Sequence, residues 1–359
     1  PKRVDGGQPE TRTLATPRFS EVASEVGLDF RWYQDVEVNL ESIPIHEMMG
    51  GGIAVVDYDL DGWPDLYFGQ GSGDPPTNQC TRPSELFRNL NANYQRTTEN
   101  AGAGDRNYST GIACGDVNQD GFPDLYLGSL GRNRLLINNG DGTFRDASDR
   151  WGDVPDRFTS SLAIGDITGN GLPELYEAIY LEMEGGFALP SKDSDGRELT
   201  PSPADFYAQS DRWFESLGNG DFSAHTITRE ITPPGTSLGV IITDLDGDRQ
   251  NEVFVSNDMR PNHLLRYDRE QGVQNLSHAL GLANGFIGSP NACMGIAVAD
   301  FNRDQTIDLH VTNFWHESAN HYVQDPEGGF TDFANRYGID ALTHPYTGFG
   351  TKAIDIDHN

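Results

Sequence analysis

Asp57-Tyr-Asp59-Leu-Asp61-Gly62-Trp63-Pro-Asp65 is the first copy of a pattern that the chain repeats in full four more times. Oxygen-bearing side chains stand at positions 1, 3, 5 and 9 of each copy, with an apolar run on either side. The later copies start at Asp116, Asp166, Asp244 and Asp300, and a sixth begins at Asp355. Repetition at intervals of roughly 50 to 80 residues indicates an architecture built from one recurring supersecondary unit.

The spacing of these oxygen donors predicts calcium loops. Calcium is a hard cation that takes about six to eight oxygens at roughly 2.3–2.6 Å. Alternate carboxylates in a tight turn point inward, position 7 adds a backbone carbonyl, and the glycine of the first three copies at position 6 permits a positive φ. The predicted ligands are Asp57, Asp59, Asp61, Trp63, Asp65, Asp116, Asn118, Asp120, Phe122, Asp124, Asp166, Thr168, Asn170, Leu172, Glu174, Asp244, Asp246, Asp248, Gln250, Glu252, Asp300, Asn302, Asp304, Thr306, Asp308, Asp355, Asp357 and Asn359.

The copies differ in charge. Loops one and four have acidic residues at all four ligand positions, loops two and five at three, and loop three only at Asp166 and Glu174. Position 6 is Arg249 in loop four and Gln305 in loop five, in place of glycine. Because fewer carboxylates bind calcium more weakly, we expect about four to six ions per chain, with loop three the weakest site.

The residues around each loop predict strands. An EF-hand would require a glutamate at loop position 12, where the first loop has Phe68, and it would require flanking helices. The flanks are instead short β-branched and aromatic runs bounded by Gly and Pro. Third and fourth strands follow, as at Asn133 and Asn262, which open an Asn-x-Leu-Leu pattern. The sequence therefore predicts an all-β, calcium-binding β-propeller of four-stranded blades, with seven blades when complete.

The repeats also predict the domain organisation. Residues 1–16 are expected to form an N-terminal tail and residues 17–359 the propeller. The expected parts are a closing strand at 17–30, blades at 50–105, 110–152, 158–231 with an insertion at 181–211, 236–282 and 290–339, and the start of a truncated sixth blade at 347–359.

The closing strand is predicted from an internal match. The stretch from Phe19 to Leu28 resembles the ends of two later units, at Val273–Leu282 and Phe330–Ile339. It should therefore be the fourth strand of a blade whose other three strands lie elsewhere. Because the sixth loop stops before its position 9, we expect a further polypeptide segment to complete the propeller and to remove its open sheet edges.

Composition excludes several classes of partner. The formal net charge is −30, and the five complete loops hold 16 of the 55 acidic residues. Such a charge argues against nucleic acid and anionic membranes as partners. The three cysteines make no disulfide framework, and no apolar run is long enough for a transmembrane segment. Because calcium loops of this kind need roughly millimolar calcium, we expect a secreted, extracellular or periplasmic protein.

Several segments resemble FG-GAP/VCBS repeats, as in integrin α-subunit propellers. The chain is more closely similar to proteins of the ASPIC/UnbV (cartilage acidic protein 1-like) family. This resemblance implies a calcium-binding propeller and a secreted protein, and it leaves the function open. The matching segments are Met49–Asp59, Asn257–Arg266, Met294–Asn302 and Thr347–Asn359.

Two functions remain open. The first is a binding, adhesion or assembly module for a protein or glycan partner, favoured because no nucleophile elbow, phosphate loop or zinc motif occurs. The alternative is an extracellular enzyme, such as a polysaccharide lyase or a metal-dependent oxidoreductase, with its site on the propeller face. An apolar patch on that face would favour binding. Two further clusters are weighed, a soft copper site at His46, Met48, Met49, Cys114, Cys293 and Met294, and a contact site at Trp315, His316 and His321.

Overall fold

The fold is known from a computed structural model. It describes residues 18–33, 44–71, 80–183, 191–192, 194–196, 198–199, 201–218, 220–326 and 328–356. Predicted features at Asp357, Asn359 and residues 1–16 lie outside these described residues.

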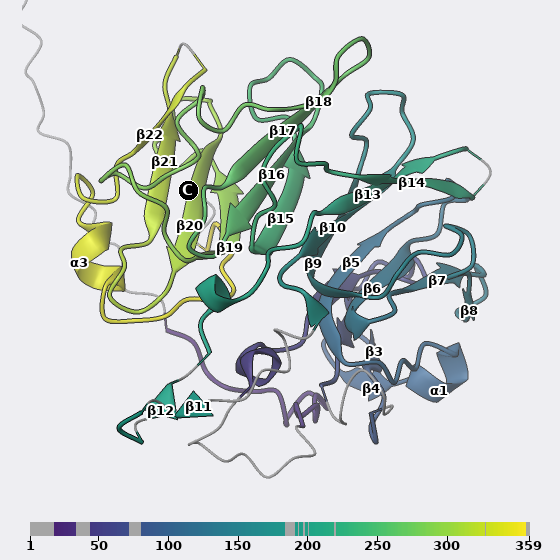
Figure 1. Ribbon diagram of the computed structural model, residues 1–359. Coiled ribbons are helices and arrows are strands. Elements are labelled where there is room, and N and C mark those ends of the chain that lie inside the picture. Colours follow the sequence, from purple (N-terminus) through teal and green to yellow (C-terminus); the bar gives the residue numbers. More distant parts are fainter. Residues whose placement is uncertain are drawn as a thin grey trace, which may run out of the picture.

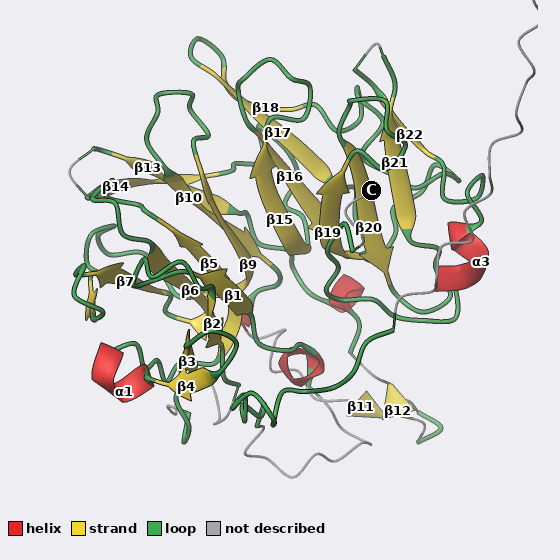
Figure 2. Cartoon of the chain, turned by 180° about the vertical axis from the view of Figure 1, so that it is seen from behind, coloured by secondary structure: helices red, strands yellow, loops and turns green. Residues whose placement is uncertain are grey.

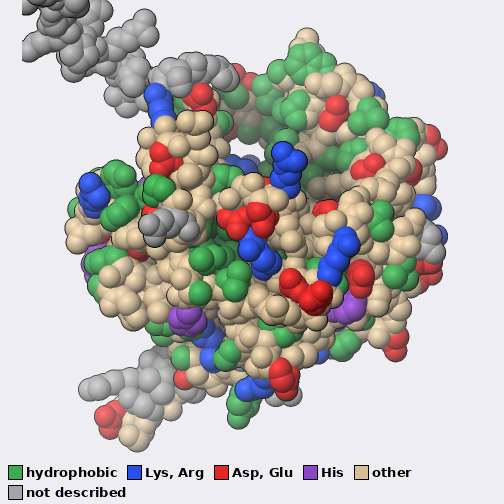
Figure 3. All heavy atoms as spheres, turned by 90° about the horizontal axis from the view of Figure 1, so that it is seen from above, with side chains coloured by type: hydrophobic (Ala, Val, Ile, Leu, Met, Phe, Trp, Pro, Cys, Tyr) green, Lys and Arg blue, Asp and Glu red, His purple; other side chains and the backbone are tan. Residues whose placement is uncertain are grey.

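The described residues form an all-β, propeller-like fold of four-stranded antiparallel units, which we call blades 1 to 5. Figure 1 shows the sheets fanning around a common centre, and Figure 3 shows the opening that this arc leaves. Blade 1 contains β1 (Ile53–Val56), β2 (Asp65–Phe68), β3 (Glu85–Asn89) and β4 (Tyr94–Arg96). Blade 2 contains β5 (Ser109–Gly115), β6 (Asp124–Gly131), β7 (Arg134–Asn138) and β8 (Phe144–Asp146). Blade 3 contains β9 (Arg157–Gly165), β10 (Glu174–Ile179), β13 (Arg212–Ser216) and β14 (Phe222–Thr226).

The last two blades repeat the plan. Blade 4 contains β15 (Ser237–Thr243), β16 (Glu252–Asn257), β17 (His263–Asp268) and β18 (Gly272–Asn275). Blade 5 contains β19 (Cys293–Ala299), β20 (Asp308–Asn313), β21 (Asn320–Gln324) and β22 (Phe330–Asp332). Blades 2 and 3 are joined into one curled sheet, because Leu130 of β6 pairs with Phe158 of β9.

The helices described are short: η1 (Ile45–Met48), α1 (Thr98–Ala101), η2 (Pro203–Asp205) and α3 (Ile339–Thr343). No helix among the described residues is long and apolar enough to cross a membrane. The insertion in blade 3 forms a hairpin of β11 (Ser191–Lys192) and β12 (Glu198–Leu199), which Figures 1 and 2 place apart from the blades.

The hydrophobic core is divided among the spaces between neighbouring blades. One apolar cluster joins blades 1 and 2, and three more repeat this arrangement along the arc to blade 5. The first strands of the blades crowd together at the centre. A Cβ on Gly111 of blade 2 would lie 2.9 Å from Cα of Ser161 in blade 3, and one on Gly239 would lie 2.3 Å from the carbonyl oxygen of Met294. Glycine at these positions therefore permits the blades to approach.

The predicted closing strand at 17–30 stays a prediction, because its ladder partner was expected outside this chain. Residues 18–22 make no strand pairing, and residues 23–27 form a turn closed by the bond from Leu28 N–H to Ala23 O, 2.8 Å. The turn contacts blade 1, where Tyr94 N–H donates to Val26 O at 2.7 Å. The turn after β18 contacts blade 5 in the same way, through Phe330 N–H and Leu280 O at 2.8 Å. The internal match therefore identified the turn, but a strand also needs a ladder partner, and residues 18–22 have none here.

Residues 347–356 also contain no strand. Their backbone follows blade 5, because Gly348 N–H donates to Asn313 O at 3.2 Å. A Cβ on Gly295 would lie 2.0 Å from Phe349 O. This segment thus lies beside β19, the first strand of blade 5. In the same way, the first strand of each later blade lies beside the first strand of the blade before it.

Candidate metal centres

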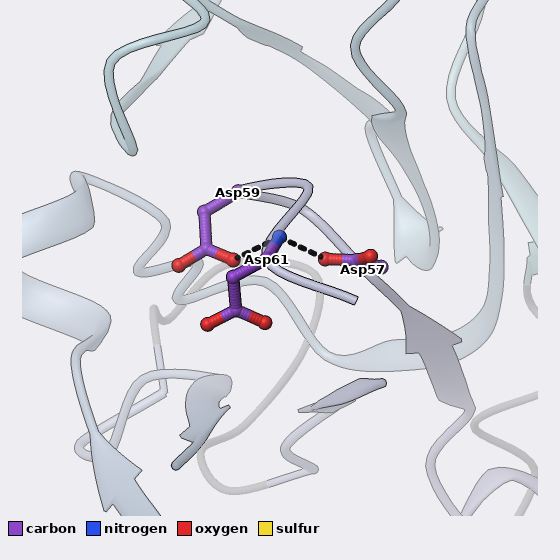
Figure 4. Close-up of side chains that lie close together, drawn as sticks. All are labelled: Asp57, Asp59 and Asp61. Atoms are coloured by element: carbon purple, nitrogen blue, oxygen red, sulfur yellow. Dashed lines mark hydrogen bonds between the residues drawn. The ribbon is translucent and has the colours of Figure 1, made fainter. Parts of the chain in front are cut away.

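Each of the five complete loops joins the first and second strands of its blade and has its own network of hydrogen bonds. In loop one, the position 1 carboxylate of Asp57 accepts the backbone N–H groups of Asp61 (3.1 Å) and Gly62 (2.9 Å). Figure 4 shows Asp57, Asp59 and Asp61 gathered around this turn. Loops two, three and five repeat both bonds. In loop four, Asp244 accepts from Gly247 and Arg249 instead, at 2.7 and 2.8 Å.

Loops four and five keep the left-handed turn without glycine at position 6. The φ of Arg249 is 73° and that of Gln305 is 74°, close to the 88° of Gly62. A positive φ is unfavourable for residues with a Cβ. The turn is therefore held by its surroundings in these two loops, chiefly by the bonds to the position 1 carboxylate.

Position 9 is buried in all five loops: Asp65, Asp124, Glu174, Glu252 and Asp308 are at most 2% exposed. Each carboxylate accepts the backbone N–H of the position 2 residue, as from Tyr58 to Asp65 at 3.1 Å. Burial raises the pKa of Asp65 to about 6 and that of Asp124 to about 7. Buried carboxylates favour a cation, because a cation offsets the loss of hydration.

The structure brings together three carboxylates in each of two loops. Among the described residues, ligand oxygens of Asp57, Asp59 and Asp61 lie within 4.8 Å of one another, and Asp244, Asp246 and Asp248 form the second such group. In loops two and five the asparagine at position 3 bonds to the aspartate at position 5, as between Asn118 and Asp120 at 2.9 Å. In loop three, Thr168 donates to Glu174 at 3.2 Å. These all-oxygen donor sets fit a calcium ion.

The position 7 residues are bonded to their loops through their backbone N–H groups, and ligation by their carbonyls stays a prediction. The N–H groups of Trp63, Phe122, Leu172, Gln250 and Thr306 donate to the position 5 side chains of their loops. Asp355 of the sixth copy is exposed, in a segment without a strand.

Two arginines that the sequence interpretation missed contact the most acidic loops. Nε of Arg88 lies 2.5 Å from Asp59, and its Nη2 lies 3.0 Å from Asp61. Arg266 pairs with Asp246, with Asp248 at 3.4 Å and with Glu252 at 2.6 Å. Both arginines come from the third strand of their blade. Only the register between the second and third strands reveals this contact.

An apolar cavity of about 470 Å³ lies where η1, blades 3 to 5 and the segment around Phe349 meet. Four of the five methionines line it: Met48, Met49, Met259 and Met294. Two carboxylates, Asp258 and Glu317, also line it. Asp258 accepts a hydrogen bond from the Tyr180 hydroxyl at 2.5 Å. Burial raises the pKa of Asp258, and the negative charge of Glu317 raises it further.

The other two clusters do not form as weighed. Met48, Met49 and Met294 share the cavity, but the thiol of Cys114 contacts Val55 O and that of Cys293 contacts Asn320. The copper set is therefore not brought together. Trp315 and His316 pack on each other with centroids 3.6 Å apart, whereas His321 packs against Phe301 and Tyr337. The predicted contact site is thus divided into an exposed pair and a buried histidine.

Known proteins whose structures are similar to this chain include a lectin and a biofilm matrix protein. A lectin from Agrocybe aegerita, described for specific recognition of non-reducing terminal N-acetylglucosamine, is 14% identical over 82% of this chain and 68% of its own, with a TM-score of 0.44. The V. cholerae biofilm matrix protein Bap1 is 16% identical over 83% of this chain and 41% of its own, with a TM-score of 0.37. No curated protein matches the sequence.

The family model described as FG-GAP-like repeat matches residues 57–127, 116–177 and 244–311. These matches together span more than half of the chain and include all five complete loops. The chain therefore belongs to the FG-GAP-like repeat family.

Proposed function

We propose that the chain is a secreted, calcium-stabilised binding module that holds a protein partner at its methionine-lined cavity. The observation that carries this proposal is the cavity of about 470 Å³ with an apolar lining and two carboxylates. Cavities of about 300–1,000 Å³ with few polar groups are typical of binding sites. A millimolar calcium concentration outside the cytosol suits the loops.

Calcium is the proposed cofactor, with four to six ions held by the ligands at positions 1, 3, 5, 7 and 9. Two observations support it. In all five complete loops the position 6 N–H donates to the position 1 carboxylate, and all five bury the position 9 carboxylate. A bound ion would neutralise side chains that otherwise repel one another, and would fix each loop to the second strand.

The chemistry of the cavity indicates the partner. Thioether side chains are flexible and adapt to apolar ligands, and Phe314 and Phe349 add aromatic surface. Asp258 and Glu317 favour a positive charge, since a cation would offset two carboxylates in apolar surroundings. We therefore propose an apolar peptide segment with one basic side chain as the occupant. The apolar lining favours a binding module over the enzyme and over a glycan site, which would need more hydrogen-bonding groups.

Two finer assignments belong to the same proposal. The first is a complete propeller of seven blades. The second is membership of the ASPIC/UnbV group, supported by the segments around Met49, Asn257 and Met294. A sequence model built from that group alone should match these segments if the second assignment is right.

The methionines provide the test. With ¹³C-labelled methionine methyl groups, the signals of Met48, Met49, Met259 and Met294 should shift when a short leucine- and phenylalanine-rich peptide with one central lysine is added. Met183 does not line the cavity and is the internal control. The same peptide with a central glutamate should shift the four signals much less. No shift, or equal shifts with both peptides, would contradict the proposal.

A pair of variants controls for non-specific binding. Met259 is 51% exposed at the cavity, and Leu217 is 57% exposed in the turn after β13. Met259→Lys should weaken binding of the lysine peptide because it places a positive charge beside the two carboxylates and in the apolar lining. Leu217→Lys makes a similar change elsewhere and should leave binding unchanged.

A further inference from the structure

One position on the third strand of every blade lies opposite the position 9 residue of that blade's loop. In blade 1, Leu66 pairs with Phe87, so the next pair along the ladder is Asp65 with Arg88. The other four registers identify the equivalent residue in the same way. Across blades 1 to 5 the residues at this position are Arg88, Ile137, Glu215, Arg266 and Val323.

The side chain at this position shares a face of the sheet with the position 9 residue, because directly opposite residues of an antiparallel pair do so. Arg266 donates from Nε to its opposite residue Glu252 at 2.8 Å and also pairs with Asp246. Arg88 pairs with Asp59 and Asp61. In blades 1 and 4 the arginine therefore adds its charge directly to the predicted calcium ligands.

The charge at this position follows the number of carboxylates in the loop. Loops one and four have four carboxylates each, and both have an arginine here. Loops two and five have three, and they have the neutral Ile137 and Val323. Loop three has two, and here it has Glu215. The ligand carboxylates and this residue together sum to −3 in every complete loop, and Arg249 within loop four and Arg303 within loop five each add one positive charge.

We propose that the third-strand residue opposite position 9 sets the charge of each calcium loop, and that Arg88 and Arg266 are built-in counter-cations of loops one and four. The inference rests on the proposed calcium function. In the ion-free loop the guanidinium offsets repulsion among four carboxylates. When calcium binds, the arginine shares those carboxylates and lowers the affinity. All loops then bind calcium with more similar affinity than their carboxylate counts alone imply.

Ordinary surface ion pairs account for only part of the pattern. Arg88 is 37% exposed in its side chain, and such a pair adds little stability by itself. If the two arginines were only incidental ion pairs, there would be no reason to expect a glutamate at the same position in the loop with the fewest carboxylates. Glu215 lies opposite Glu174 in the strand register and pairs with His225 at 3.0 Å. It restores the third negative charge that loop three lacks, so this loop need not be the weakest site.

Loop one offers a specific reporter. Trp63 occupies its position 7 and is 44% exposed, whereas the other loops have Phe, Leu, Gln and Thr there. Terbium(III), an oxygen-seeking cation that replaces calcium, emits light when a nearby indole is excited. Terbium emission should therefore report loop one, and Trp63→Phe should abolish it. Calcium competition against this signal gives the calcium affinity of loop one.

The decisive comparison is Arg88→Gln against Arg96→Gln. Both remove one positive charge from blade 1, but Arg96 pairs with Asp29 and Glu85 and not with the loop. Arg88→Gln should bind calcium about tenfold more tightly at loop one, from the Coulomb energy of a unit charge near a divalent ion. Arg88→Lys, which keeps the charge, should stay close to the unaltered chain. Arg96→Gln should change the affinity less than twofold.

A second readout does not depend on bound metal. In excess chelator, Arg88→Gln should melt at a lower temperature than Arg96→Gln, because four loop carboxylates lose their counter-cation. Equal affinities and equal melting temperatures for Arg88→Gln and Arg96→Gln would overturn the inference while leaving calcium binding intact. No terbium or calcium binding by the unaltered chain would overturn the proposed function as well.

Discussion

Arg266 and Glu252 lie side by side on neighbouring strands, with Nε 2.8 Å and Nη2 2.6 Å from the same carboxylate oxygen. The other oxygen of Glu252 accepts the N–H of Leu245 at 2.9 Å. One buried carboxylate thus connects the loop backbone, the second strand and the third strand. Changes at a calcium loop should therefore reach the whole blade that carries it.

Asp61→Ala should act locally. Losing one of four carboxylates should weaken calcium at loop one by about an order of magnitude. Because repeat stability is largely local, backbone amide hydrogen exchange should quicken in blade 1 and stay unchanged in blade 4. Asp141→Ala, in the exposed turn between β7 and β8, is the matched control. Faster exchange spread evenly over all blades would refute local action.

Removing calcium should lower the melting temperature steeply. An ion present at 100 times its dissociation constant stabilises the folded state by about 2.7 kcal/mol per site. Several sites together should move the midpoint by at least about 10 °C. Melting in calcium and in chelator at matched ionic strength is the measurement. Equal midpoints would rule out stabilisation by calcium.

Asp211→Asn should change how stability depends on pH. Burial raises the pKa of Asp211 to about 7, against hydrogen bonds from Ile179 N–H, Ser237 and Tyr176. A carboxyl group with a raised pKa stabilises the fold below its unfolded pKa of about 4, and this contribution is lost as pH rises through about 7. The residue just before the third strand is Asp211 in blade 3, and it is asparagine in blades 2 and 4, at Asn133 and Asn262. The side-chain oxygen of each asparagine also accepts a backbone N–H.

The Asp211→Asn variant should therefore gain stability over the unaltered chain between pH 5 and pH 8, by up to about 3 kcal/mol. Denaturant unfolding at the two pH values in excess calcium measures this difference. Asp153→Asn removes the same charge at an exposed site and should show no such gain. A parallel pH profile for Asp211→Asn and the unaltered chain would contradict the argument.

Gly111→Ala should destabilise the contact between blades 2 and 3. The new Cβ would lie 2.9 Å from a backbone atom of Ser161, which cannot move without the strand. Overpacking of this kind costs about 1–3 kcal/mol. Gly50→Ala is the control, since a Cβ there meets nothing within 4 Å. Denaturant unfolding should separate the two variants, and equal stability would show that the blades can spread.

The repeated loops could be predicted because each is encoded within about a dozen residues. The β-branched and aromatic residues of the flanking runs then indicated strands, and the recurrence indicated a repeated blade. The segment from Phe19 to Leu28 shows where local pattern stops being sufficient. Its turn is encoded locally and forms, but a strand requires a partner that no local pattern supplies.

The cavity and the loop arginines could not be predicted for a related reason. Met49, Met259 and Met294 are far apart in the sequence and meet only because the blades curve around one centre. Arg88 looks like any residue of an apolar strand until the register places it opposite Asp65. Long-range register is set by packing of the whole sheet, so it becomes visible only in the structure.

Counting calcium tests the central claim most directly. Protein purified in calcium and passed through a desalting column should be analysed for metal by mass spectrometry, with the chain quantified by amino-acid analysis. We expect at least four calcium ions per chain, with loops one, two, four and five among the occupied sites. One ion or none per chain would contradict the account.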